Sequence, residues 1–310
     1  MDLRDSIIQT IAWFNLFDFP LTAEEVQAYL LNYDKPLHIK EVKGILGQLV
    51  EGRQIELIKD HYVLPGRAAI TETRKARKFI AEKLWNRVKL YGQYMRDVPF
   101  VRMIAVCNNL SYDNASEQSD IDLFVVVKPG RMWIARLLIT LILQFFGVRR
   151  HGDKVAGRFC LSFFVTDRKL GMEELALSPT DPYLAYWTKM LCPVYDEGVY
   201  GEFKKANADW ILKGYGLRFG LDCRKHLYVE GKSGLKKAVE WILDGKLGDG
   251  IEWLLKKTFK KKTLAHMQKL GPEASVMVSD DILKFHNHDK RTQYREKWLK
   301  YRQQPPPPSN

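Results

Sequence analysis

Cysteine is scarce in this chain, and no two cysteines stand at the short spacing that structural zinc sites use. The four cysteines are Cys107, Cys160, Cys192 and Cys223. The first residues, Met1 to Asp5, are charged and do not have the pattern of a secretion signal. We therefore expect a cytoplasmic protein whose cysteines are reduced thiols in the core.

Long hydrophobic runs are also rare, and only Met132 to Val148 is apolar enough to be considered as a membrane span. This run is slightly short for a bilayer. Arg136, Thr140 and Gln144 recur in it at every fourth position, which aligns them as one polar stripe on a helix. We therefore predict a buried helix of a globular domain and no membrane span.

Positive charge is in excess, because 49 lysines and arginines against 37 aspartates and glutamates give a formal net charge of +12. A surplus of this size favours partners rich in phosphate, namely nucleic acid, nucleotides or an anionic membrane. The alternative is a basic surface with no special partner, and the net charge alone does not distinguish these two interpretations.

Residues 1–66 have the pattern of a winged-helix domain. Apolar residues repeat at helical spacing from Leu3 to Asn15 and from Ile39 to Val50. Between these helices, Thr22 and Glu25 have the spacing of a capping box, and two short strands complete the pattern. The third helix lacks the cluster of arginine or asparagine residues that would contact base edges in DNA. This favours a role in docking a protein or positioning a substrate over sequence-specific DNA binding.

A long basic helix is expected from Ala68 to Gln93, followed by an apolar strand from Val101 to Val106. A polar loop then leads to a second strand that begins with Asp120-Ile121-Asp122. Because side chains alternate along a strand, Asp120 and Asp122 point the same way. Two such carboxylates can hold Mg²⁺, which commonly shares its ligand shell with substrate phosphates. The alternative for this acid pair is a solvated strand start.

The segment from Val101 to about Trp133 resembles the DNA polymerase beta-like nucleotidyltransferase superfamily, including its members with an N-terminal winged helix. In that family a strand ends in Gly-Ser, a loop and short helix follow, and Asp-x-Asp opens the next strand. The resemblance implies that Asp120 and Asp122 are the catalytic metal ligands. It also implies Mg²⁺ or Mn²⁺ as the cofactor and an NTP as the substrate, with metal ions activating the attacking oxygen and stabilising the leaving pyrophosphate.

Four further residues are candidates for nucleotide binding. Asn108 and Asn109 stand where the family has Gly-Ser, and an asparagine amide can donate a hydrogen bond to phosphate. Ser119 precedes the acid pair, where its alternative role is to cap the turn. Arg131 follows the second strand and can pair with phosphate oxygens, although it equally fits a cation at a helix start.

The family's third carboxylate, usually on a neighbouring strand, has no counterpart in this chain. The candidate strand, Gly157 to Thr166, contains neither aspartate nor glutamate, and Ser162 lies near the expected position. The third acid normally acts as a general base or as an extra metal ligand. Its loss predicts slow chemistry, an unusual acceptor or no catalysis.

The last third of the chain is predicted to be mostly helical. Tyr183 to Leu191, Tyr200 to Leu212 and Leu235 to Leu255 show apolar residues at helical spacing. A basic run from Lys256 to Lys262 fits either a solvated helix end or a contact with an anionic partner.

We therefore predict an α+β protein with four parts: a winged helix at 1–66, a mixed-sheet nucleotidyltransferase domain with its leading helix at 67–180, a helical region at 181–304 and a Pro-rich tail at 305–310. The predicted function is transfer of a nucleoside monophosphate from an NTP to an acceptor hydroxyl. The acceptor stays open among nucleic acid, protein and small molecule. The alternative is a non-catalytic protein that binds nucleic acid or protein and uses the transferase fold as a scaffold.

Overall fold

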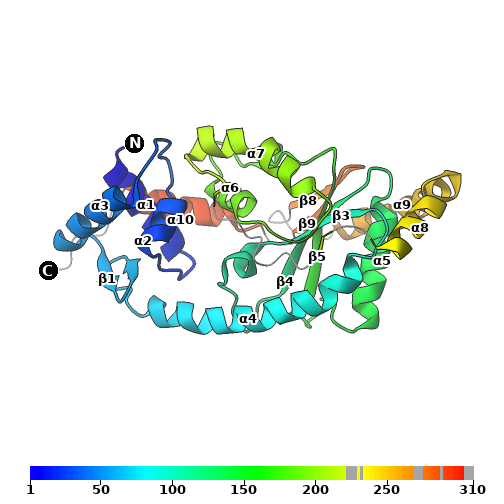
Figure 1. Cartoon of the computed structure of the whole chain (residues 1–310), viewed down its shortest axis with the longest axis horizontal. Helices are drawn as coiled ribbons and strands as arrows, with labels where there is room; N and C mark the ends of the chain where they lie inside the picture. Colours follow the sequence, from blue (N-terminus) through cyan, green and yellow to red (C-terminus); the bar gives the residue numbers. More distant parts are fainter. Residues whose placement is uncertain (221–228, 231–232, 268–274, 287–288, 304–310) are drawn as a thin grey trace.

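The computed structural model describes residues 1–220, 229–230, 233–267, 275–286 and 289–303. The expected tail at 305–310 and Cys223 lie outside these residues. Within them the chain folds as a mixed α/β protein with helices on both faces of a mixed sheet (Figure 1). Among the described residues, no helix combines the length and the apolar character needed to cross a membrane.

The N-terminal elements follow the predicted order of three helices and a hairpin. The predicted capping box forms, since the Thr22 hydroxyl accepts from the Glu25 backbone N–H at 3.3 Å and the Glu25 carboxylate accepts from the Thr22 backbone N–H at 2.9 Å. These local hydrogen bonds define where the second helix begins. The elements are α1 (Leu3–Asn15), α2 (Ala23–Ala28), α3 (Ile39–Glu51), β1 (Glu56–Ile58) and β2 (His61–Val63).

Helix α4 (Ile70–Met95) runs along the lower edge of the molecule and joins the N-terminal elements to the sheet (Figure 1). Near its start, Arg74 forms two hydrogen bonds of 2.6 and 2.7 Å with the Glu25 carboxylate. Further along, the Trp85 indole N–H donates to Asp113 at 2.8 Å. Arg74 and Trp85 therefore attach the first turns and the middle of this helix to the rest of the protein, and the basic pattern of its sequence is only partly a solvated face.

The central sheet has the strand order β7-β6-β3-β4-β5-β9-β8. Strand β4 pairs antiparallel with β3 and parallel with β5, so the sheet is mixed. The strands are β3 (Val101–Val106), β4 (Ile121–Val127), β5 (Phe159–Thr166), β6 (Cys192–Asp196), β7 (Val229–Glu230), β8 (Ser275–Val278) and β9 (Ile282–His286).

Both faces of the sheet are buried, because alternate residues of each strand enter different cores. Met103 and Ala105 face a core shared with α1, α6 (Pro182–Lys189), α7 (Val199–Tyr215) and α10 (Arg291–Gln303). Ile104 and Val106 face a second core with α4 and α5 (Met132–Phe145). Helix α5 is the helix predicted from the longest apolar run. The remaining elements are the 3₁₀ helices η1 (Asn108–Tyr112) and η2 (Glu173–Leu175) and the helices α8 (Gly234–Leu243) and α9 (Lys246–Met267).

The C-terminal third is not purely helical as predicted. It contributes β6, β7, β8 and β9, which pair into the same sheet as β3, β4 and β5. These strands are short apolar runs, and periodicity alone does not separate a short buried strand from a helical turn. The helix predicted from Leu235 to Leu255 is also two helices, since α8 ends at Leu243 and α9 begins at Lys246.

Candidate metal centre

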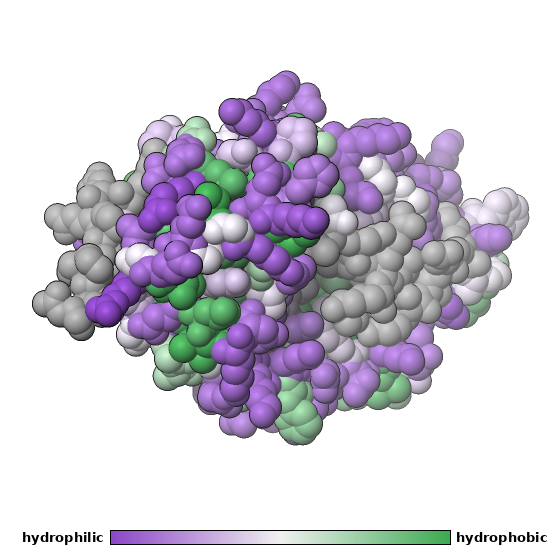
Figure 2. Space-filling model, turned by 60° about the vertical axis from the view of Figure 1, so that its left-hand side comes forward, coloured by the Kyte–Doolittle hydropathy of each residue, from purple (hydrophilic) through white to green (hydrophobic). Residues whose placement is uncertain are grey.

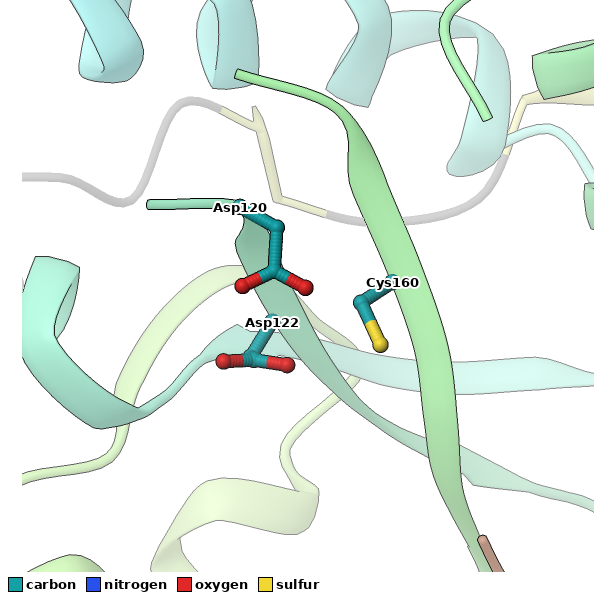
Figure 3. Close-up of side chains that lie close together, drawn as sticks. All are labelled: Asp120, Asp122 and Cys160. Carbon is teal, nitrogen blue, oxygen red and sulfur yellow. The ribbon is translucent and has the colours of Figure 1, made fainter. Parts of the chain in front are cut away.

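The two aspartates of the Asp-Ile-Asp segment stand at the start of β4, where the strand emerges from the core. Ile121 between them is fully buried, whereas Asp120 and Asp122 are half-buried and share the other side of the strand. Strand β5 runs parallel to β4, and its register sets Cys160 opposite Asp122. In Figure 3 the two carboxylates and the thiol point toward one another.

This cluster has the dimensions of a metal site. One carboxylate oxygen from each aspartate and the Cys160 sulfur all lie within 4.8 Å of one another. The sequence predicted the two aspartates, but it gave Cys160 only the role of a core thiol. Cys107 and Cys192 are buried as predicted, while Cys160 is half-buried and belongs to the cluster. Only the pairing of β4 with β5 reveals this, because the two strands are separated along the chain by α5.

The position near which the sequence suggested a third acid is filled differently. Ser162 lies two residues beyond Cys160 on β5 and is buried. Cys160, rather than Ser162, is the β5 side chain that reaches the acid pair. The third side chain of the cluster is therefore a thiol, where the resemblance implied a carboxylate.

Electrostatics in the cluster disfavour negative charge. Burial and the neighbouring Asp120 raise the pKa of Asp122. Burial and the two aspartates raise the pKa of the Cys160 thiol to about 12. A divalent cation reverses this effect, because a bound cation stabilises carboxylate and thiolate together.

Arg150 is the cation that faces the cluster, and sequence reasoning missed it. Its guanidinium donates to Asp120 Oδ2 at 2.6 Å and approaches the Cys160 sulfur at 3.6 Å. The side chain is 44% exposed, so breaking its ion pair with Asp120 to form another costs little free energy. Arg150 lies just after α5, far enough from the Asp-Ile-Asp segment in sequence that no local pattern connects them.

Asn108 directly follows β3 and Cys107, and it is the predicted nucleotide-binding residue that the structure brings closest to the acid pair. Its amide donates to Asp122 Oδ2 at 2.7 Å, and its Oδ1 accepts from the Tyr183 hydroxyl at 3.3 Å. Its backbone has a φ of 58°, in the left-handed region that asparagine tolerates better than most residues. Asparagine is therefore compatible with a backbone position at which a glycine was expected.

Asn109 and Ser119 lie in the same loop but bond to the loop itself. Asn109 is exposed, and its Oδ1 accepts from the Tyr112 hydroxyl at 3.0 Å. The Ser119 hydroxyl accepts from the Ser116 backbone N–H at 2.9 Å, which closes the turn before Asp120. The turn-cap role for Ser119 is thus observed.

Arg131 is not brought to the acid pair. It follows the far end of β4, whereas the aspartates stand at the near end of this strand. Its side chain is buried, pairs with Asp249 at 2.7 Å and donates to the Leu243 carbonyl at 3.1 Å. These contacts attach α8 and α9 to the start of α5, so Arg131 acts as a helix-start cation.

A cavity of about 180 Å³ lies beside Asn108, and neither Arg150 nor the two acids belong to its lining. Lys284 of β9 projects into it and is buried, donating to Ser275 Oγ at 2.8 Å. Burial and the nearby Arg291 lower the pKa of Lys284 to about 8. The cavity lining consists of Asn108, Phe163, Leu175, Tyr183, Leu184, Trp187, Lys284, Asp289, Lys290, Arg291 and Tyr294.

A second, smaller cavity of about 40 Å³ also touches Asn108 and is mostly aromatic. Helix α1 supplies Trp13 and Phe14 to its wall, the turn after α1 supplies Phe17, and α6 supplies Tyr183, Tyr186 and Trp187. Asn108 therefore lies where the acid pair, a cavity with a buried lysine and an aromatic cavity meet.

Comparison of this chain with protein-family models, with curated proteins and with solved structures finds no match.

Proposed function

We propose that this chain is a metal-dependent nucleotidyltransferase that moves a nucleoside monophosphate from an NTP to an acceptor hydroxyl. The observation that carries the proposal is the convergence of Asp120 and Asp122 at the start of β4, beside the loop that follows β3. A strand, a polar loop and a strand opened by Asp-x-Asp are the arrangement that the resemblance to polymerase beta-like enzymes leads one to expect. The proposal includes that fold for the sheet region and a winged helix for the N-terminal elements.

The donor atoms of the cluster fit a divalent cation. Two carboxylates suit Mg²⁺ or Mn²⁺, and a thiolate is a softer ligand that favours later transition metals over Mg²⁺. Asp120, Asp122 and Cys160 would hold the ion, which would polarise the phosphate and stabilise charge on the leaving pyrophosphate. Because the set combines one sulfur with two carboxylates, and Mn²⁺ is a transition metal that also suits carboxylates, we propose Mn²⁺ ahead of Mg²⁺ as the working metal.

The surrounding side chains have separate tasks in this proposal. Asn108 fixes the orientation of Asp122 through their 2.7 Å hydrogen bond. Arg150 neutralises Asp120 while no substrate is bound, and its exposed guanidinium can turn to a phosphate oxygen when a cation takes its place. Lys284 presents a buried cation to an anionic group of the substrate in the adjoining cavity.

The role of the N-terminal elements follows from the aromatic cavity. Because α1 forms one wall of a cavity that touches Asn108 and Asn109, these elements are part of the substrate-binding region. This supports substrate positioning, rather than DNA reading, as the task of the proposed winged helix.

The test is a transfer assay with each of the four α-labelled NTPs, with Mg²⁺ or Mn²⁺, against a bacterial cell extract. We expect the wild type to move label to an acceptor, and the double variant Asp120→Asn, Asp122→Asn to lose at least about a thousandfold of this activity because the metal ligands are gone. Asp209→Asn, at an exposed position of α7, is the matched control and keeps full activity.

A second candidate, a non-catalytic binding protein, is favoured by one observation: the Arg150 guanidinium already pairs with Asp120. In that case the acid pair is a structural ion pair. The absence of transfer with every NTP, together with no rise in melting temperature on adding Mn²⁺ and NTP, would support this candidate and reject the enzyme. A rise in melting temperature with RNA or duplex DNA alone would identify its ligand.

A further inference from the structure

Helices α8 and α9 form a hairpin at one end of the molecule, beyond the end of α5 (Figure 1). Large apolar side chains on this hairpin are exposed to between 37% and 83%. On α9 they recur at i, i+4 and i+7, which makes a continuous stripe along one face. The exposed residues are Leu235, Trp241, Ile242, Leu247, Ile251, Trp253 and Leu254.

The acids of this hairpin all point at the rest of the protein. The Glu240 carboxylate accepts from the Phe100 backbone N–H at 2.6 Å, and Asp244 pairs with Lys128. Asp249 pairs with Arg131 at 2.7 Å. The Glu252 carboxylate accepts from two backbone N–H groups at the start of α5, each at 2.9 Å. Each of these four acids is therefore engaged by a group of the protein body, although the side chains of Asp244 and Asp249 are also exposed to solvent.

The lysines of the hairpin have the opposite distribution. Lys236 is buried against the sheet and Lys256 pairs with Asp280, but Lys237, Lys246, Lys257 and Lys261 are exposed. The Lys257 ammonium lies 5.0 Å from the centre of the Trp253 ring, so basic and aromatic groups share one surface. The hairpin thus exposes apolar side chains beside lysines, while its acids are paired with groups of the protein body.

We propose that the outer face of α8 and α9 binds the surface of an anionic lipid bilayer. Exposed aliphatic and indole side chains enter the boundary between headgroups and acyl chains, where tryptophan is favoured. Lysines beside them contact lipid phosphates, and each cation near the surface adds to the attraction. The acid contacts hold the hairpin to the protein body, which keeps this face turned outward.

The side-chain types favour lipid over nucleic acid. Nucleic acid needs stacking rings and cations, whereas five of the seven exposed apolar residues named above are leucine or isoleucine, which do not stack on bases. The opposite end of the molecule, which Figure 2 brings forward, is mainly hydrophilic with only small groups of apolar residues.

The experiment is co-sedimentation of the full chain with vesicles of equal parts phosphatidylcholine and phosphatidylglycerol, and with vesicles of phosphatidylcholine alone. We expect binding to the anionic vesicles only. The double variant Trp241→Ser, Trp253→Ser and the double variant Lys246→Glu, Lys257→Glu should each weaken it at least about tenfold. Phe79→Ser, which removes an exposed ring from α4, is the control and binds as the wild type does.

Thermal melting of each variant verifies that it is folded, since all the replaced side chains are exposed. No binding to anionic vesicles, or equal binding to both kinds, overturns the proposal. It is also overturned if the hairpin variants instead lose binding to labelled oligouridine, or lose self-association measured by light scattering, because the face then serves RNA or a second copy of the chain.

Discussion

Cys160 puts a sulfur atom beside two carboxylates, at a position where a third oxygen ligand would give a site suited to Mg²⁺. A thiol of raised pKa keeps its proton at neutral pH, and it becomes a ligand only when a cation stabilises its thiolate. The identity of this one residue therefore determines which ions the cluster prefers.

We expect Cys160→Asp to bind Mg²⁺ at least about tenfold more tightly than the wild type and Cd²⁺ at least about tenfold less tightly, because hard oxygen replaces soft sulfur. Titration calorimetry with both ions measures this. Cys160→Ser is the control that removes the thiol without adding a charge. Unchanged Cd²⁺ affinity in Cys160→Ser would show that the sulfur is not a ligand.

The residues of the site differ in how far the sequence could predict them. Asp120, Asp122 and Asn108 belong to one strand-loop-strand segment, so local pattern was enough to bring them together. Cys160 and Arg150 reach the cluster through the register of β5 and the turn after α5, which no local pattern encodes. Arg131 was close in sequence but lies at the other end of β4.

At the scale of elements, the N-terminus of α5 is capped by a side chain of α9, a helix that is far from it in sequence. Helix α5 has no side-chain cap of its own, and Glu252 of α9 accepts from its backbone N–H groups at Trp133 and Ile134. A carboxylate at a helix N-terminus satisfies free donors and interacts favourably with the helix dipole. The two helices therefore stabilise each other.

Glu252→Ala should lower the free energy of unfolding by about 1–3 kcal/mol, because it leaves buried backbone donors without an acceptor. Urea denaturation measures the change. Glu296→Ala, at an exposed position of α10, is the matched control and should stay within about 0.5 kcal/mol of the wild type. Equal stability of Glu252→Ala and Glu296→Ala would mean that the cap contributes nothing.

Some elements could be predicted to the residue and others could not. The bounds of α1 and β3 match the sequence pattern, because apolar periodicity and a following polar segment define both of them. The strands β6, β8 and β9 were missed, because a short apolar run becomes a strand only where a neighbouring strand offers hydrogen-bonding partners. The sheet is in this sense a property of the whole chain.

At the scale of the whole molecule, two carboxylates, one just after β6 and one just after β9, are held ionised by neighbouring hydrogen-bond donors. Burial opposes ionisation of Glu197, but hydrogen bonds from Lys236, Tyr195 and Arg102 lower its pKa to about 2. In the same way, Arg291 lowers the pKa of Asp289 to about 2 against the effect of burial. Both carboxylates have ordinary pKa values near 4 when the chain unfolds.

Acid should therefore destabilise the fold through these two groups. A lowered folded-state pKa means that the stabilisation is present above the unfolded-state value and is lost as the pH falls through the folded-state value. We expect the free energy of unfolding to fall between about pH 4.5 and pH 2, by up to about 3 kcal/mol for Glu197. Urea titrations at several pH values measure this decline.

The variant Glu197→Gln tests how much of the acid sensitivity comes from Glu197 and how much from other carboxylates. The variant should be less stable than the wild type at neutral pH, since Lys236 and Arg102 lose their buried partner, but its stability should decline less steeply in acid. A decline as steep as in the wild type would assign the acid sensitivity to other groups.

The first and last helices of the described chain lie against each other. Trp298 of α10 donates its indole N–H to the Gln9 carbonyl of α1 at 3.2 Å, and its ring meets Trp13 edge-on at 6.0 Å. A ribosome releases α1 long before α10, so Trp13 lacks one of its packing partners until α10 has been synthesised. Throughout that interval the nascent chain exposes part of its aromatic core, which makes it a substrate for chaperones until α10 emerges.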